Sequence, residues 1–167
     1  MEIERKFLCD APADIETWRH TDIEQAYLCD TPVVRVRRDG DDYWLTYKSS
    51  GILSHEEYNL PLTAEAYAHL VAKADTAPLS KTRYRKDIRR ELNGVEKGLV
   101  IELDIFHGSL APLVMAEVEF ETEADANAYI PEDWFVREVT YVKGYHNSSL
   151  IKDGLPADFS EERKQKI

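Results

Sequence analysis

With 167 residues, the chain is long enough for one domain with a core of its own. Its composition, 43% hydrophobic and 32% charged, is typical of a globular protein and excludes a largely disordered one. The formal net charge of −11 argues against a general nucleic-acid-binding surface, which would be basic. No apolar run approaches the roughly 18–20 residues that span a bilayer, and the charged N-terminus does not resemble a signal peptide.

The two cysteines, Cys9 and Cys29, are too few for a disulfide framework and lack the spacing of metal ligands. We therefore expect a reduced, cytoplasmic setting without a membrane or nucleic-acid partner, and the sequence leaves the oligomeric state open. Basic residues cluster within 35–38 and again within 81–90. An acidic exterior around a basic interior would reconcile these clusters with the net charge, and a basic interior favours a small, highly charged anion.

The first eight residues alternate strictly, as the two faces of a strand do. Glu2, Glu4 and Lys6 therefore share one face. Two carboxylates and an ammonium would be costly to bury there without partners. The face is either the solvated side of an edge strand or one wall of a wet cavity, and the recurrence of the same pattern further along the chain favours the cavity.

The next segments predict several short strands. The pattern of residues 11–20 is ambiguous and allows a short helix around 15–18. Strands are expected over 24–29, 33–38, 43–48 and 56–60. Asp39-Gly40-Asp41 is typical of a hairpin turn. Arg35 and Arg37 fall on one face of their strand, opposite the valines between and beside them.

Residues 63–74 form the clearest predicted helix. Thr63 can cap it, and apolar residues follow at helical spacing, namely Tyr67, Leu70, Val71 and Ala74. This apolar stripe is expected to pack on the outside of a sheet.

A long β-hairpin follows, with strands over 79–92 and 99–106 and a turn at Asn93-Gly94. Basic side chains alternate onto one face of its first strand, and acidic ones onto one face of its second. A further strand over 113–121 carries Glu117 and Glu119 on one face. A short helix near 123–129, a strand over 136–140 and a short helix at 145–151 complete the predicted elements, and the chain beyond Pro156 is expected to be loosely held.

These elements define an α+β, mainly β domain of about eight mostly antiparallel strands with one dominant helix. Nearly every strand is charged on one face and apolar on the other. In an ordinary barrel or sandwich the inner face would be the apolar one. We expect the reverse here, with the apolar face covered by helices and the charged face lining a hydrated channel.

The charged residues recur as pairs two positions apart on separate strands. The sets are Glu2/Glu4, Arg35/Arg37, Lys81/Arg83, Glu102/Asp104 and Glu117/Glu119. Carboxylates from separate strands can converge on Mg²⁺ or Mn²⁺, and guanidinium and ammonium groups bind phosphate oxygens. A basic wall facing an acidic, metal-binding wall is what metal-assisted phosphoryl transfer to water requires.

The N-terminal Glu-Ile-Glu-Arg-Lys resembles the ExExK signature of the CYTH family, the triphosphate tunnel metalloenzymes. Other matching segments follow in the family's order over nearly the whole chain. They are Arg35-Val36-Arg37, Lys48, Lys81-Thr82-Arg83-Tyr84, residues 103–106, Glu117-Val118-Glu119-Phe120, residues 138–140 and residues 145–147.

The resemblance implies a closed eight-stranded antiparallel β-barrel, a tunnel with a charged lumen and flanking helices, over residues 1–156, followed by a C-terminal tail over 157–167. By position, the metal carboxylates would be Glu2, Glu4, Glu117 and Glu119, holding Mg²⁺ or Mn²⁺. Phosphate would be held by Lys6, Arg35, Arg37, Lys48, Arg83, Arg85 and also Lys81.

Tyr27 and Lys81 match a Tyr–Lys pair that some short bacterial members use to activate water, and a nearby ammonium favours the phenolate. The alternative is that Tyr27 is a half-buried strand aromatic. Glu57, Glu102 and Asp104 are secondary candidates, as salt-bridge partners that orient the basic wall.

The favoured function is therefore metal-dependent hydrolysis of the terminal phosphoanhydride of inorganic tripolyphosphate. One alternative keeps the fold but acts on a nucleoside or thiamine triphosphate, or is an adenylate cyclase; a cyclase needs a pocket for adenine, and none is identifiable in the sequence. The other alternative is a non-catalytic module that binds polyphosphate or nucleotides, although such a module would gain little from carboxylates that repel its ligand.

Overall fold

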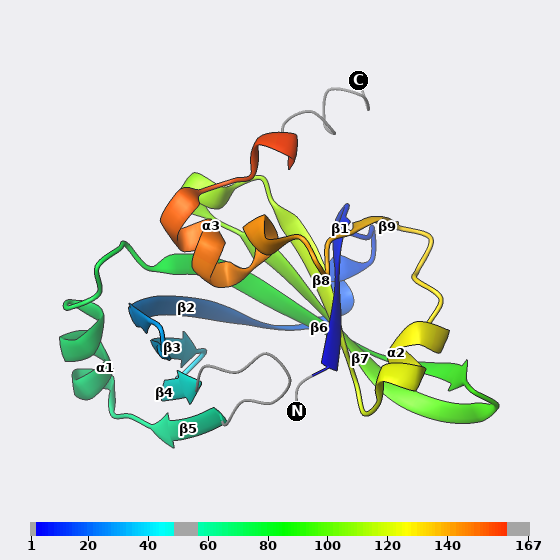
Figure 1. Ribbon diagram of the computed structural model, residues 1–167, viewed down its shortest axis with the longest axis horizontal. Coiled ribbons are helices and arrows are strands. Elements are labelled where there is room, and N and C mark those ends of the chain that lie inside the picture. The colour runs from blue at the N-terminus through cyan, green and yellow to red at the C-terminus, as the bar shows by residue number, and fades with distance from the viewer. Residues whose placement is uncertain (1–2, 49–56, 160–167) are drawn as a thin grey trace.

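An antiparallel sheet organises the chain in the computed structural model, which describes residues 3–48 and 57–159; within these residues the sheet has nine strands (Figure 1). The strands are β1 (Ile3–Cys9), β2 (Arg19–Asp30), β3 (Val33–Asp39), β4 (Asp42–Lys48), β5 (Glu57–Pro61), β6 (Leu79–Leu92), β7 (Val95–Phe106), β8 (Val114–Phe120) and β9 (Phe135–Glu138). The α-helices are α1 (Ala64–Val71), α2 (Glu123–Ala128) and α3 (Asn147–Asp153). Short 3₁₀ turns lie at Ile15–Thr17, Gly108–Leu110 and Lys143–Tyr145.

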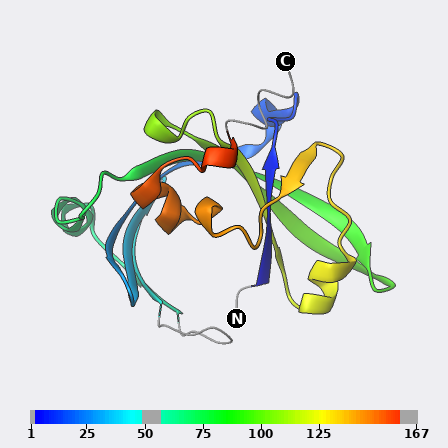
Figure 2. The same cartoon turned by 45° about the horizontal axis from the view of Figure 1, so that its top comes forward.

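The sheet is open, so the expected closed eight-stranded barrel is wrong. Its strand order is β5-β4-β3-β2-β6-β7-β8-β1-β9, and within the described residues no ladder joins the two edge strands β5 and β9. The sheet curls into an open arch instead, with α3 lying inside the curl (Figure 2). Closure requires edge strands that pair over a matched length. The two edges here are five and four residues long, and the register between β1 and β9 shifts at Leu8/Cys9.

The predicted hairpin between β6 and β7 is confirmed and is the longest pairing in the sheet. Its twelve register pairs run from Lys81↔Phe106 to Leu92↔Val95. Asn93 and Gly94 turn the chain with φ values of +52° and +78°. Both values lie in the left-handed region that a two-residue hairpin turn requires and that asparagine and glycine tolerate best.

The outer, convex face of the sheet carries the apolar residues, as predicted. Tyr67 of α1 packs against Ala26 and Val36, and a larger cluster around Phe7 and Leu103 lies beneath α2. α1 begins where expected, because the Thr63 hydroxyl accepts a hydrogen bond from the Ala66 N–H at 3.2 Å. It ends at Val71 rather than at residue 74, since the N–H groups of residues 73 and 74 bond three residues back in a tighter turn.

The inner, concave face is charged in its middle and apolar at one end. Leu8, Phe106 and Met115 lie on the same strand faces as the charged residues but further along, and they pack with Tyr145 and Leu150 beneath α3. Phe159 joins this apolar cluster. α3 therefore covers one end of the curl, and the charged residues line the space that remains. None of the helices in residues 3–48 and 57–159 is long and apolar enough to cross a membrane.

Candidate active site

A cavity of about 460 Å³ lies on the concave face and is lined from β1 through β8 and by the first residues of α3. All the predicted site residues that the structure describes meet in it. They are Glu4, Lys6, Tyr27, Arg35, Arg37, Lys48, Lys81, Arg83, Arg85, Glu117 and Glu119. Glu2, the remaining predicted metal ligand, lies outside the described residues. Alternation along each strand places these side chains on one face, and the curl brings the strands around a common space.

The cations of β6 are bound by carboxylates of the neighbouring strands. Asp104 is fully buried and accepts hydrogen bonds from the Lys81 ammonium and, at 2.6 and 2.7 Å, from Nε and Nη2 of Arg83. Arg83 also donates to Glu102, and at 2.8 Å to Glu117 Oε2. Arg83 therefore ties together three carboxylates from β7 and β8.

Lys6 occupies a similar position on β1. Its ammonium lies 2.8 Å from Glu4 Oε1 and 2.7 Å from Glu117 Oε1. Burial opposes the charged form of Lys6, but the two carboxylates outweigh it and hold its pKa above the ordinary value. The pKa of Glu117 is correspondingly well below its usual range, because Lys6, Arg83 and Lys81 outweigh the effect of burial. Both groups therefore stay charged at neutral pH.

Lys81 differs from Lys6, because its environment disfavours the ammonium. The side chain is 2% exposed, and burial together with the nearby Arg83 guanidinium lowers its pKa even though Asp104 is beside it. Tyr27 lines the same cavity, but the β2–β6 register places Ile23 opposite Lys81 and Gln25 opposite Leu79. No hydrogen bond joins Tyr27 to Lys81 in the described part of the chain, and the activation of Tyr27 by Lys81 stays a prediction.

Three secondary candidates are confirmed as salt-bridge partners of the basic residues. Asp104 binds Lys81 and Arg83, as described above. Glu102 Oε1 accepts from Arg85 at 2.9 Å as well as binding Arg83. Glu57 Oε2 lies 2.8 Å from the Lys48 ammonium, which fixes the basic residue at the β4–β5 side of the cavity.

The β2–β3 side of the cavity has a different character. The Nε atoms of Arg35 and Arg37 and the Nε2 atom of Gln25 are buried and find no hydrogen-bond partner among the residues that the structure describes. Burial and the adjacent Arg35 guanidinium lower the pKa of Arg37. Sequence reasoning found the arginines but missed Gln25, although it follows the same alternation as Tyr27.

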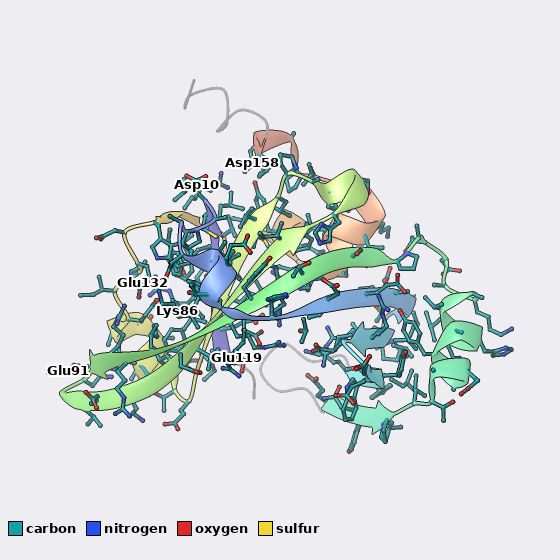
Figure 3. All side chains as sticks on the ribbon, turned by 180° about the vertical axis from the view of Figure 1, so that it is seen from behind. Asp10, Lys86, Glu91, Glu119, Glu132 and Asp158 are labelled. Atoms are coloured by element: carbon teal, nitrogen blue, oxygen red, sulfur yellow. The ribbon has the colours of Figure 1, made fainter. Side chains whose placement is uncertain are left out.

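The carboxylates on β1 and β8 are the donor type that a divalent cation prefers, and they share one face of the sheet. Glu4 and Glu119 are directly opposite each other in the antiparallel register, and Glu117 is the next residue on the same face (Glu119 is labelled in Figure 3). Like charges directly opposite each other repel, and a cation between them would remove that repulsion. In residues 3–48 and 57–159, however, no three metal-ligating side chains form a ready-made cage, and Lys6 now holds both Glu4 and Glu117.

The chain thus combines an open antiparallel sheet with a charged concave face, on which carboxylates pair with a row of cations. Residues 1–149 match the model of the CYTH domain, so the chain is a member of the CYTH family and the resemblance seen in the sequence is confirmed.

Curated relatives cover almost the same span. The chain is 38% identical over 152 residues to the inorganic triphosphatase of Nitrosomonas europaea, covering 89% of this chain and 95% of that protein. It is 34% identical over 158 residues to the inorganic triphosphatase of Acetivibrio thermocellus, covering 91% and 94%. The crystal structure of the inorganic triphosphatase NE1496 matches with a TM-score of 0.65 at 36% identity, over 90% of this chain and 94% of that one.

Proposed function

We propose that this protein is an inorganic triphosphatase that hydrolyses the terminal phosphoanhydride of tripolyphosphate with the help of Mg²⁺ or Mn²⁺. The observation that carries the proposal is the two-sided cavity, in which the buried, unpartnered donors of Arg35 and Arg37 lie across from the carboxylates of Glu4, Glu117 and Glu119 among the described residues. The similarity to two inorganic triphosphatases supports the same reaction.

In this proposal each side of the cavity has its own task. Arg35 and Arg37 bind the phosphate chain, because guanidinium groups form paired, charge-assisted hydrogen bonds to phosphate oxygens. Lys48 and Arg85 add positive charge at the two flanks of the arginines. Arg83 acts mainly through other residues, since its donors already bind Asp104, Glu102 and Glu117.

Glu4, Glu117 and Glu119, with Glu2 as the predicted fourth ligand, would hold the cation, and a bound divalent cation neutralises phosphate charge and acidifies water. Lys6 contributes by keeping Glu4 and Glu117 together on the same side of the cavity. Tyr27 is the candidate base, because its side chain lines the cavity and lies opposite Arg35 in the β2–β3 register.

A second cavity gives one alternative a physical basis. It has a volume of about 570 Å³, shares Arg85, Glu102 and Glu119 with the charged cavity, and includes Leu99 and Phe120 in its lining. This space beside the charged cavity has a lining of both apolar and charged residues, and it could hold the base of a nucleoside triphosphate or the organic part of thiamine triphosphate, which sequence reasoning could not locate.

The test is phosphate release from tripolyphosphate, ATP, thiamine triphosphate and pyrophosphate, with Mg²⁺, with Mn²⁺ and with chelator. We expect rapid, metal-dependent release from tripolyphosphate and slow turnover of the others. Preference for ATP or thiamine triphosphate would replace the proposal with the alternative, and tight binding of tripolyphosphate without turnover of any substrate would leave a binding module.

A matched pair of variants tests the acidic wall. Glu119→Gln removes one cavity carboxylate and is expected to lower kcat/KM at least about tenfold and to raise the metal concentration needed for half-maximal rate. Glu121→Gln, two residues along, removes a largely exposed carboxylate that pairs with Lys97 at 2.6 Å, and it should leave the rate unchanged. Equal activity of the two variants would contradict the assignment of Glu119.

A further inference from the structure

Gln25 is a buried polar residue that the charge pattern does not explain. It lies on β2 with 2% of its surface exposed and lines the charged cavity between Ile23 and Tyr27. Its Nε2 atom has no hydrogen-bond partner within residues 3–48 and 57–159. Native proteins rarely bury an amide donor without an acceptor, because the lost hydration is not compensated. The position of Gln25 therefore indicates an acceptor that residues 3–48 and 57–159 do not supply.

The neighbours of Gln25 indicate what that acceptor is. Gln25 is directly opposite Arg37 in the β2–β3 register, and Arg35 is the next residue of β3 on the same face. The Nε atoms of both arginines are buried and likewise unpartnered in the described part of the chain. The three side chains, on two adjacent strands, thus line one cavity, in which a ligand rich in acceptor oxygens and negative charge would suit them all.

The part of the cavity lined by β6, β7, β8 and β1 is different, and this contrast indicates where an anion would bind. There Lys6, Lys81 and Arg83 already donate to carboxylates of β1, β7 and β8. A phosphate oxygen there would compete with Glu117 or Asp104 for the hydrogen-bond donors of Lys6, Lys81 and Arg83. On the β2–β3 side, a phosphate oxygen would displace no acceptor from Gln25 Nε2 or from the Nε atoms of Arg35 and Arg37 within the described residues. The β2–β3 side is therefore the part of the cavity ready for an anion.

We propose that Gln25 is a further substrate-binding residue, whose amide N–H donates to a non-bridging phosphate oxygen that Arg37 also binds. The inference rests on the proposed function and adds to it a contact with the phosphate chain. A neutral carboxamide suits this position, because a third cation beside Arg35 and Arg37 would increase their mutual repulsion. An amide supplies the directional donor without that cost, and so it orients the phosphate chain rather than merely attracting it.

If Gln25 binds substrate, its replacement should weaken binding without lowering the stability of the fold. If Gln25 had only a structural role, its replacement would lower both together. Gln25→Met keeps an unbranched side chain of similar length but removes the amide. Since no protein acceptor in the described residues loses a bond from Nε2, the variant should unfold at the same denaturant concentration as the wild type or a higher one. Its affinity for tripolyphosphate, measured by calorimetry without metal, should fall at least about tenfold, as expected for a hydrogen bond to a charged group.

Two further variants sharpen the comparison. Gln25→Glu places a negative charge beside the arginines and should weaken binding more than Gln25→Met. Tyr67→Phe is the matched control. Tyr67 belongs to α1, which covers the opposite face of β2, and its hydroxyl donates to Glu24 Oε1 at 2.7 Å. This variant should lower stability and leave the affinity for tripolyphosphate unchanged.

Unchanged affinity of Gln25→Met would overturn the inference, and so would a loss of affinity that is accompanied by a comparable loss of stability. The proposed function fails differently: the wild type would bind tripolyphosphate but not hydrolyse it with Mg²⁺ or Mn²⁺. In that case a binding defect of Gln25→Met would still support the contact.

Discussion

Asp104 is the residue on which the buried cations of β6 depend, and its replacement gives a strong prediction. The carboxylate is fully buried and accepts hydrogen bonds from Lys81 and, twice, from Arg83, which are themselves 2% and 8% exposed. Asp104→Asn keeps the shape but removes the charge, and one of its two side-chain oxygens becomes an amide that can only donate. Two buried cations then lose a counter-charge at the same time.

Breaking a buried ion pair by removing one partner costs about 3–5 kcal/mol, because the remaining charge is left without compensation. We expect the loss for Asp104→Asn near the lower end of that range, since Arg83 keeps its bonds to Glu102 and Glu117. A loss of about 3 kcal/mol is a large share of the roughly 5–15 kcal/mol that stabilises a typical domain.

Urea unfolding followed by tryptophan fluorescence measures this loss directly. Asp87→Asn is the control on the same hairpin, because Asp87 pairs with Arg19 at the surface, where both side chains are largely exposed, and should show no measurable change. The double variant Asp104→Leu with Lys81→Met should recover part of the stability, since it removes one cation together with the acid. If Asp104→Asn unfolds within about 1 kcal/mol of the wild type, the pair is screened by water and the reasoning fails.

Two further predictions concern parts of the fold outside the cavity. Arg5 donates to Glu138 at 2.9 and 2.6 Å, and mainly these hydrogen bonds lower the pKa of Glu138 below its ordinary 4.5. The resulting stabilisation is present above about pH 4.5 and disappears as the pH falls through the lowered pKa. Glu138→Gln should therefore be less stable than the wild type near neutral pH and approach the wild-type stability in acid. A difference in urea midpoints that stays constant with pH would contradict this. Gly94→Ala should cost roughly 1 kcal/mol, because its φ of +78° disfavours a Cβ although nothing lies within 4 Å of it; an unchanged melting temperature would refute that backbone argument.

Alternation along single strands predicted which side chains share the concave face, and it did so well. The spacing in Lys81-Thr82-Arg83 or Glu117-Val118-Glu119 is a local property, and Lys81, Arg83, Glu117 and Glu119 all line the cavity. Of the predicted pair Glu102/Asp104, Glu102 lines the cavity and Asp104 is fully buried beneath it. The Asn93-Gly94 turn was equally predictable, because few residue pairs accept two positive φ angles.

What alternation could not predict was which strands meet in space. Whether β5 pairs with β9 depends on the curl of the whole sheet and on the bulk of α3 within it, and neither is encoded in a period of two residues. The start of β2 was missed for a related reason. Residues 19–21 pair with Arg85, Tyr84 and Arg83, but they have no apolar periodicity to mark them as a strand.

The division of the cavity into two unlike sides was also beyond sequence reasoning. Lys81, Arg83 and Arg35 have the same charge in the sequence, yet the structure gives the first two buried carboxylate partners and leaves the third with an unpartnered Nε among the described residues. Gln25 was missed because a single neutral amide in an apolar strand carries no periodic signal.

The open edges of the sheet also determine how the cavity responds mechanically to its contents. A closed barrel has a circumference set by its hydrogen bonds, so its bore cannot change unless the ladder breaks. In this sheet Arg35 and Arg37 on β3 form one wall of the cavity, and Glu117 and Glu119 on β8 form the other. The two walls are linked through β2, β6 and β7, while β5 and β9 are joined by no ladder in the described residues. A small change of twist at each intervening strand pair alters the width between the walls without the loss of any of those hydrogen bonds. The width of the cavity is thus a compliant property of the sheet, and a ligand that altered this width would convert part of its binding free energy into elastic deformation of the sheet.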